Sequence, residues 1–452
     1  MAPGQPAENR EAVLATLSFL PSVYPLVRQY EQISELNVNG TIVPMGRTRI
    51  PVATPWDRWN AQGRLDHQLG QKDSLTYRYQ WGRFEAPLAT LGPGMTNNSF
   101  GPRFASSEEI VYASHAVSHT RVFSPRWLNE VRLAYTRAFN DAQPLGEAGP
   151  STAINNFFTF GGAVAAPWQR DARSWQWQDV VTHQQGRHGL KAGVDLNRVR
   201  VFVLNQATVR GQWTFMNFAD FLYRAFRFTQ AFVPSITDIV SLQHSYFVQD
   251  DIKIRLNLTV NIGLRYQIAD VPEGLYGTTD PALLAVGVPE PVRRDSNDWA
   301  PRVGIAYSPG KGRMVLRGGF GISYLQGTSN TFVPMTRNNY PRNAVDERAQ
   351  AATVNQYPTI PPKPAAIPPL NPAQVFTNAM PDIQNPTTHF YSASVQRQFG
   401  RDYIAELGYS GNRSYHLQRM GERNPAILTE AQGNRSSRRK TRTASRRNPR
   451  GV

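Results

Sequence analysis

The segment from Leu256 to Tyr266 alternates apolar residues with polar or small ones at every position. Successive side chains of a β-strand point to opposite faces, so this segment would have one apolar face and one polar face. Its eleven residues also match the roughly 9–11 that a tilted strand needs to cross the hydrocarbon core of a bilayer. The segment is therefore predicted to be a membrane-crossing strand.

The same alternation recurs in pairs along the chain and predicts six β-hairpins. Each pair is joined by a few residues that include Gly, Pro or Asp, or that are short and polar, as hairpin turns require. The predicted pairs are Trp59–Leu69 with Ser74–Phe84, Ile110–Phe123 with Trp127–Ala138, Ser174–Gln185 with Gly189–Val199, Gln243–Ile254 with Asn257–Tyr266, Trp299–Ser308 with Arg313–Tyr324, and His389–Phe399 with Asp402–Ser410.

Short turns within the hairpins alternate with long connections between them. The connections hold roughly 25 to 60 residues, rich in Gly, Pro, Asn and Thr: Glu85–Glu109, Phe139–Arg173, Arg200–Leu242, Gln267–Asp298 and Leu325–Thr388. Outer-membrane barrels have this rhythm, whereas soluble all-β domains join most strands briefly. We therefore expect an all-β, antiparallel, up-and-down transmembrane β-barrel, incomplete at about twelve strands, with long loops on one side and short turns on the other.

Two of the long connections are expected to have local structure. Phe218–Phe226 is predicted to form a short helix, and the seven prolines of Tyr357–Pro372 indicate an extended, polyproline-like segment.

Composition excludes several classes of protein. A mean hydropathy of −0.45, with no run of about 18 apolar residues, excludes a transmembrane helix but not a barrel with a polar lumen. The absence of cysteine excludes disulfides, thiol nucleophiles and Cys-ligated metals. Of the net charge of +16, eight units lie in the tail from Ala431 to Val452, which has no acidic residue. A short basic tail is usually disordered and solvated, so nucleic-acid binding is not expected.

Candidate metal and acid–base residues have simpler structural interpretations. His67, His115, His119 and His183 lie in predicted strands, where the second and third would share a face but lie about 13 Å apart, too far to chelate one ion. Asp250 and Asp251 would point to opposite faces and are expected to be structural or interfacial. The glycine-rich segments at 310–312 and 318–321 match neither a P-loop nor a dinucleotide motif.

Two further sets of residues are expected to follow the two faces of the sheet. On the polar face, lumen ion pairs are expected for Arg78, Arg132, Arg265 and Arg317. Near the strand ends, at the membrane interface, we expect Trp81, Trp127, Trp175, Trp177 and Trp299. We therefore assign no catalytic, cofactor-binding or metal-binding residue and no cofactor, and any ligand-binding residues are unknown.

The hairpin sequences resemble the barrels of TonB-dependent, Oar-like outer-membrane receptors. The similarity extends over about residues 11–428 and is carried by "GRLDHQLGQKDSLTYRYQ" (63–80), "RHGLKAGVDL" (187–196), "HSYFVQDDIKIRLNLTVNIGLRYQ" (244–267), "NDWAPRVGIAYSPGKGRMVLRGGFGISY" (297–324) and "HFYSASVQRQFGRDYIAELGYSGNRSYHL" (389–417). The resemblance implies a 22-stranded barrel, an N-terminal plug, often a carboxypeptidase-regulatory-like domain, a signal peptide, and energised uptake through a periplasmic TonB box.

The chain departs from this plan in three respects. No plug, TonB box or signal peptide precedes the first hairpin, about twelve strands are visible, and the chain does not end in a strand with a terminal aromatic residue. We expect a lead-in segment at 1–58, a partial barrel at 59–428 and a basic, disordered tail at 429–452, as a frameshift or truncation after about Leu428 would produce.

The leading hypothesis is therefore a fragment of a non-enzymatic, Oar-like receptor in the outer membrane of a Gram-negative bacterium. Its role would be energised uptake of an unknown solute or surface adhesion. Its partners would be outer-membrane lipid, the solute, and the TonB complex through regions missing from this chain. The alternative is a secreted, soluble, all-β carbohydrate-binding protein whose apolar faces pack in a dry interior. A cationic nucleic-acid-binding protein is a third interpretation that depends on the tail alone.

Overall fold

A computed structural model describes most of the chain between residues 31 and 419. The described residues are 31–38, 41–47, 53, 55–89, 106–145, 149–155, 158–162, 166–206, 208–216, 220–221, 226–232, 234–272, 275, 281, 284, 290–310, 312–326, 332–335, 345–348, 362, 365–366 and 381–419. The chain divides into two compact units, Met1–His416 and Leu417–Val452, and every described strand lies in the first.

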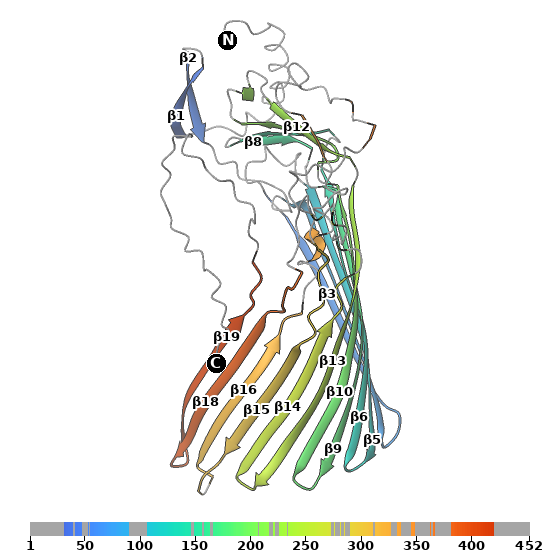
Figure 1. Cartoon of the computed structure of the whole chain (residues 1–452), viewed down its shortest axis with the longest axis vertical. Helices are drawn as coiled ribbons and strands as arrows, with labels where there is room; N and C mark the ends of the chain where they lie inside the picture. Colours follow the sequence, from blue (N-terminus) through green and yellow to red (C-terminus); the bar gives the residue numbers. More distant parts are fainter. Residues whose placement is uncertain are drawn as a thin grey trace. The chain divides into compact units, whose positions relative to one another are not determined.

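Twelve antiparallel strands form the main sheet (Figure 1). In chain order they are β3 (Asp57–Gln68), β4 (Asp73–Ala89), β5 (Ser106–Ser124), β6 (Trp127–Pro144), β9 (Trp168–Gln185), β10 (His188–Asn205), β13 (Ser235–Arg255), β14 (Leu258–Ala269), β15 (Asp298–Tyr307), β16 (Met314–Tyr324), β18 (Thr387–Phe399) and β19 (Tyr403–Tyr415). Their order in the sheet is their order in the chain, so each strand pairs with the next one along the sequence.

All six predicted hairpins are present with the predicted partners. The short turns lie where the sequence placed them, and several use glycine in the left-handed region, as at Gly186 (φ 59°) and Gly400 (φ 63°). Neighbouring hairpins are joined by further backbone bonds beside the turns, such as Lys253 N–H to Arg187 O at 2.8 Å. Residues 90–105, 145–167, 206–234, 270–297 and 325–386 connect the hairpins at the opposite end of the sheet. We call these two ends the turn side and the loop side.

Several strands are longer than predicted on the loop side. β9 begins six residues before the predicted Ser174, β10 continues to Asn205, and β13 begins at Ser235, eight residues before the predicted Gln243. The segments Phe139–Arg173 and Arg200–Leu242 were predicted to be loops, and this was wrong at both ends of each. Their strand-paired ends do not keep the regular alternation of the membrane-crossing parts, and the inner face there carries buried apolar residues such as Val201 and Val203.

The structure also describes smaller elements outside the main sheet. β1 (Glu31–Val38) and β2 (Thr41–Arg47) form an antiparallel hairpin. A five-stranded sheet has the order β17-β12-β11-β7-β8. Its strands are β7 (Ser151–Ile154), β8 (Phe158–Gly161), β11 (Gln212–Phe215), β12 (Phe226–Ala231) and β17 (Val345–Arg348). Four large aromatic side chains associated with this sheet are at most 1% exposed: Trp213, Phe215, Phe221 and Phe228.

The two predictions of local structure have different outcomes. Asp220 and Phe221 are helical, as predicted, but Phe226 begins strand β12. The prolines of 357–372, apart from Pro362, lie outside the described residues. No helix within the described part of the chain is long and apolar enough to cross a membrane.

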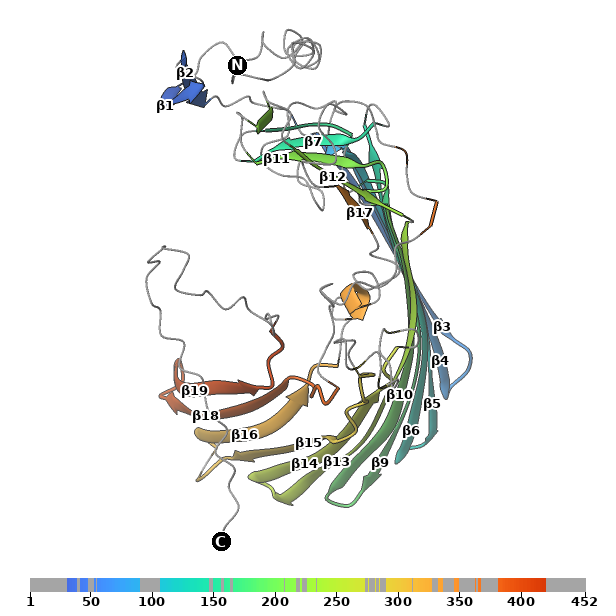
Figure 2. The ribbon, with the colours of Figure 1, turned by 45° about the horizontal axis from the view of Figure 1, so that its top comes forward.

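The main sheet is curved (Figure 2), and its two faces differ in chemistry. We call the face that carries Leu133, Trp175 and Leu264 the outer face, and the face that carries Gln176, Asp195 and Arg265 the inner face; the strand registers place each set on one side. Inner-face residues at the loop side pack against Phe332 and Val333. The short orange helix that contains these two residues lies on the concave side in Figure 2, so the inner face is the concave one.

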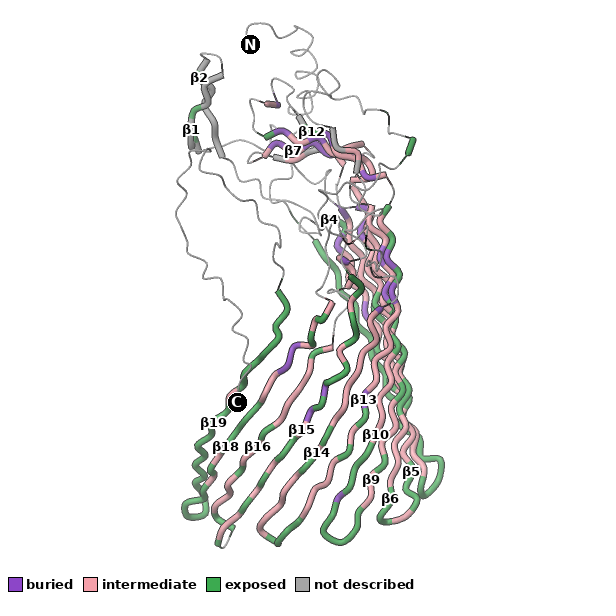
Figure 3. The backbone as a smooth tube through the Cα atoms, in the orientation of Figure 1, coloured by how far each residue is buried: buried purple, intermediate pink, exposed green. Residues whose placement is uncertain are grey.

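Apolar side chains of the outer face are exposed, whereas those beside them on the inner face are partly covered. Leu133 is 54% exposed, Trp175 60% and Leu407 79%. Figure 3 shows this alternation along the strands, with buried residues gathered mainly towards the loop side. A soluble sandwich would bury these side chains against a second sheet. Among the described residues no second sheet covers them, so the soluble alternative does not fit this fold.

Candidate functional site

The inner face has a hydrogen-bonded network at the centre of the sheet. Asp195 on β10 accepts hydrogen bonds from two amides of β9, Gln176 at 3.0 Å and Gln178 at 2.8 Å. Two positions along β10, Asn197 accepts a bond from the Ser174 hydroxyl at 2.6 Å and donates to Gln243 at 3.3 Å. Amide and carboxylate groups of three neighbouring strands therefore form one polar surface on the concave side.

The four arginines predicted for the polar face all lie on the inner face. Arg132 donates to Glu130 at 2.7 Å, and Arg317 donates to Gln396 at 2.9 Å. Arg78 lies within electrostatic range of Asp66, and Arg265 lies within range of Asp195 and Arg302. Arg132 therefore forms an ion pair of the predicted kind with Glu130, whereas Arg317 bonds to an amide.

Aromatic side chains lie at both ends of the apolar part of the outer face. On the turn side, Trp127 stacks on His183 with ring centroids 3.9 Å apart. On the loop side, Tyr135 packs against Trp175 at 4.6 Å, and Tyr266 packs against Trp299 at 4.5 Å. Amphipathic rings in two rows on a lipid-facing surface are typical of the two interfaces of a bilayer. The predicted tryptophans lie on this face, Trp81 and Trp177 included.

His115, His119 and the acidic pair have structural partners. His115 shares a hydrogen bond of 2.9 Å with the Tyr77 hydroxyl, and His119 shares one of 3.0 Å with Asp73. The two histidines lie on the same face with different partners, which agrees with their predicted structural role. Asp250 pairs with His188 at 2.7 Å on the outer face, whereas Asp251 accepts a bond from Gln249 at 2.9 Å on the inner face.

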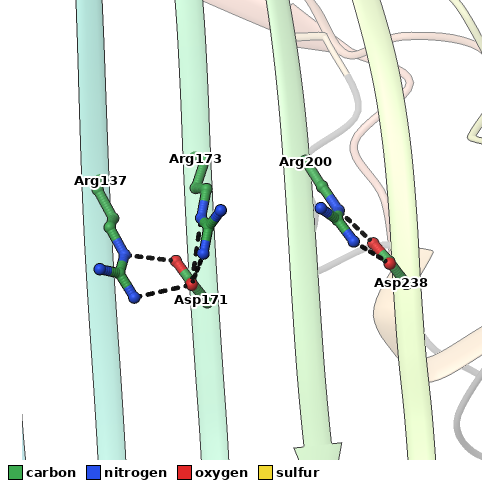
Figure 4. Close-up of polar contacts among 5 residues, drawn as sticks. All are labelled: Arg137, Asp171, Arg173, Arg200 and Asp238. Carbon is green, nitrogen blue, oxygen red and sulfur yellow. Dashed lines mark hydrogen bonds and ion pairs between the residues drawn. The ribbon is translucent and has the colours of Figure 1, made fainter.

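Sequence reasoning missed a row of charged residues that continues the outer face towards the loop side. Arg137 on β6, Arg173 on β9 and Arg200 on β10 are direct cross-strand neighbours. Asp171 bridges the first two arginines, with nitrogen–oxygen distances of 3.0 Å and 2.6 Å. Asp238 on β13 forms a two-bonded ion pair with Arg200 (Figure 4). We call these five residues the outer charged row.

The outer charged row marks a change in burial along the strands. On the turn side of the row the outer face is apolar and exposed, and on the loop side of the row the inner face has a buried apolar cluster. There Val201 and Val203 are 2% exposed and Ile239 is 4% exposed, and Phe332 and Val333 pack against them. The sequence contains a signal for this boundary, because on β6 a charged residue, Arg137, takes the next position of the parity that had been apolar through Leu133 and Tyr135.

The distances match those of a bilayer. Arg137 lies ten positions beyond Trp127 on β6, which is about 33 Å of strand, or about 25 Å along the membrane normal at a tilt of about 40°. An outward apolar band of about 25 Å, bounded by aromatic rows and backed by a polar concave face, is the structure of an outer-membrane β-barrel wall. The fold and its two faces therefore define a membrane-embedded, barrel-forming protein.

Comparison with known families gives the same class. Residues 23–450 match the model of the family described as "Outer membrane beta barrel domain". The chain belongs to this family and is a protein of the outer membrane of Gram-negative bacteria. A search of curated proteins finds no sequence that matches this chain.

Solved structures of similar fold include two receptors and one transporter. They are the siderophore receptor PirA from Acinetobacter baumannii (TM-score 0.48, 11% identity), the ferripyoverdine receptor of Pseudomonas aeruginosa (0.44, 14%) and the transporter YddB from Escherichia coli (0.41, 10%). The alignments cover 79%, 79% and 78% of this chain but 43%, 50% and 46% of those proteins. The chain thus spans half or less of the length of the structures that it matches.

Proposed function

We propose that this chain is part of the barrel of a TonB-dependent, Oar-like receptor that takes up a solute across the outer membrane. The observation that carries the proposal is the polar inner face, where Gln176, Gln178 and Asp195 form a connected network behind an apolar, lipid-facing wall. A wall of this kind lines an aqueous path through the membrane. The sequence resemblance of segments 244–267, 297–324 and 389–417 to Oar-like receptors supplies the receptor type.

The proposal assigns the membrane domain to residues 59–428, a lead-in segment to 1–58 and a basic tail to 429–452. Strands that begin at Asp57 and end at Tyr415 support the first assignment. The solute and the TonB complex are the proposed partners. The protein is proposed to act without catalysis.

Adhesion at the cell surface is the second candidate within this class. It is favoured by the length of the connections on the loop side, of which 325–386 is the longest. Long outer loops are the parts of a barrel that face the medium.

Uptake by intact cells distinguishes the two candidates. A strain whose gene lacks β14–β16 is compared with the parent for uptake of ferric siderophores, copper and labelled oligosaccharides, each with and without a protonophore. We expect one solute whose uptake is lost in the deletion strain and in protonophore-treated parent cells. Gln176→Ala with Gln178→Ala should reduce that uptake, whereas the outer-face change Ile262→Val should not. Loss of surface attachment without loss of any energised uptake would favour adhesion.

A further inference from the structure

The outer charged row has a position that neither a solute path nor a protein core explains. Its arginines lie on the convex face, away from the polar interior, and Arg137, Arg173 and Arg200 are 43%, 45% and 45% exposed. Like charges directly opposite one another in a sheet destabilise it. The three arginines nevertheless occupy one cross-strand row, and among the described residues two aspartates form ion pairs with them.

In each of these arginines, one edge of the guanidinium group is hydrogen-bonded to an aspartate and another edge is available. Arg137 and Arg200 bond their aspartates through Nε and Nη2, and Arg173 uses the same two nitrogens towards Asp171. Within the described part of the chain, Nη1 of these three arginines makes no hydrogen bond. The aspartates therefore occupy one edge of each guanidinium group and leave three Nη1 groups in a line about 10 Å long, two strand spacings.

The neighbourhood of the row is apolar on the turn side. Trp175 on β9 and Tyr135 on β6 lie two residues nearer the turn side than Arg173 and Arg137, on the same face. Leu133 lies two residues further along β6, also on this face. Arg198, two positions from Arg200 on β10, is also exposed on this face. With Arg198 the local charge is four arginines against two aspartates, a net +2.

We propose that the outer charged row, together with Arg198, binds the phosphate groups of phosphorylated glycolipids in the outer leaflet. Guanidinium groups bind phosphate with charge-assisted hydrogen bonds, which suits the available Nη1 edges. Short turns face the periplasm and long connections face outwards, so the loop side lies at the outer leaflet. The exposed Trp175 and Leu133 then contact the acyl chains of the same lipid. A free anion has no acyl chains and could not make these contacts.

A lipid-binding assay on the full chain tests this assignment. The 452-residue protein is purified from outer membranes in dodecylmaltoside and titrated with bis-phosphorylated lipid A in mixed micelles, and bound lipid is counted by native mass spectrometry. One basic residue near an anionic surface contributes about five-fold in affinity. We therefore expect the triple variant Arg137→Gln, Arg173→Gln, Arg200→Gln to bind about a hundred-fold more weakly, and wild-type binding to weaken as salt rises from 0.1 M to 1 M.

A matched control removes the same charge from the other face. Arg78→Gln, Arg132→Gln, Arg317→Gln changes three inner-face arginines and should bind lipid A as the wild type does. Equal affinity of wild type and the outer triple variant would overturn the proposal, as would an equal loss in the inner triple variant. Displacement of lipid A by an equal concentration of inorganic phosphate would also overturn it, because the acyl-chain contacts would then contribute nothing.

A second variant keeps the test decisive if the outer triple variant fails to insert. Asp171→Asn with Asp238→Asn removes the two internal counter-charges and leaves every arginine. If the row binds phosphate, this variant should bind lipid A more tightly, because the net charge rises. If the row is only a structural ion-pair network, the same variant should lose heat-resistant β structure and bind no more lipid than wild type, and that result would contradict the proposal.

Discussion

At the scale of single residues, close packing of aromatic rings over glycines fixes parts of the sheet. Gly193 on β10 lies under the ring of Phe247 on β13, and a methyl group added there would approach the ring to 2.6 Å and the Asp179 carbonyl oxygen to 2.8 Å. Backbone atoms cannot move aside as a flexible side chain can. The glycine is therefore required by its neighbours rather than by its own backbone angles.

We predict that Gly193→Ala lowers the free energy of unfolding by about 1–3 kcal/mol, the usual cost of overpacking. The matched control is Gly63→Ala on β3, where nothing lies within 4 Å of the added methyl group. This control should be neutral or stabilise by up to about 1 kcal/mol, because alanine loses less conformational entropy than glycine. Urea unfolding of both variants in lipid vesicles measures the difference, and equal stability of the two would show that Phe247 does not constrain the site.

Residue parity predicted most side-chain directions correctly. The opposite faces of Asp250 and Asp251, and the shared face of His115 and His119, follow from a period of two alone. The partners could not be read in the same way. His119 bonds to Asp73, forty-six positions away, and that pairing depends on which strands become neighbours.

At the scale of the strands, the alternating exposure has a direct chemical test. The natural chain has no cysteine, so any introduced cysteine is the single thiol of the protein. On β14 we predict that Asn261→Cys and Gly263→Cys react with a membrane-impermeant maleimide in outer-membrane vesicles, and that Ile262→Cys and Leu264→Cys are protected. The reason is that the first pair faces an aqueous interior and the second pair faces lipid.

The pattern should reverse beyond the outer charged row. On β10, Phe202→Cys on the outer face should react with the maleimide, and Val203→Cys on the inner face should be protected in the buried core. If Leu264→Cys and Phe202→Cys were both protected from the maleimide, both positions would lie in lipid. The membrane boundary would then lie on the loop side of the outer charged row. Labelling of all four β14 variants would show that this strand does not cross the membrane.

The lengths of the strands were the least predictable property at this scale. The alternation predicts the whole of β14, because its apolar residues from Leu258 to Ile268 all lie on the outer face. In β9, β10 and β13 the regular alternation ends at the membrane boundary, where Arg173, Arg200 and Asp238 occupy positions on the outer face, and an interrupted alternation resembles the end of a strand. The sequence therefore predicts a loop for this extension, although Val201, Val203 and Ile239 form a buried core there.

At the scale of the whole molecule, the sheet has two edges among the described residues. β3 and β19 each pair on one side only, with β4 and β18. Unpaired backbone groups are not tolerated in the hydrocarbon core of a bilayer, so in the membrane these edges must pair with further strands. The twelve-stranded sheet is accordingly one part of a closed wall.

We expect the chain to depend on detergent throughout. It should fractionate with outer membranes, stay monodisperse above the critical micelle concentration of dodecylmaltoside, and precipitate when detergent is removed. The physical reason is the continuous exposed apolar surface of the outer face, which water cannot solvate without association. A monodisperse species in detergent-free buffer, measured by light scattering, would contradict the membrane assignment.

The sequence by itself determined the hairpins, their turns and the face on which each membrane-crossing side chain lies, because a period of two and turn chemistry are local properties of the chain. Only the tertiary structure decided where the outer face changes from apolar to charged and which connections fold back over the strands. Both depend on contacts between distant segments, as when Phe332 packs on Val201 or Asp238 pairs with Arg200. Such contacts are set by strand register and sheet curvature, which no short stretch of sequence encodes.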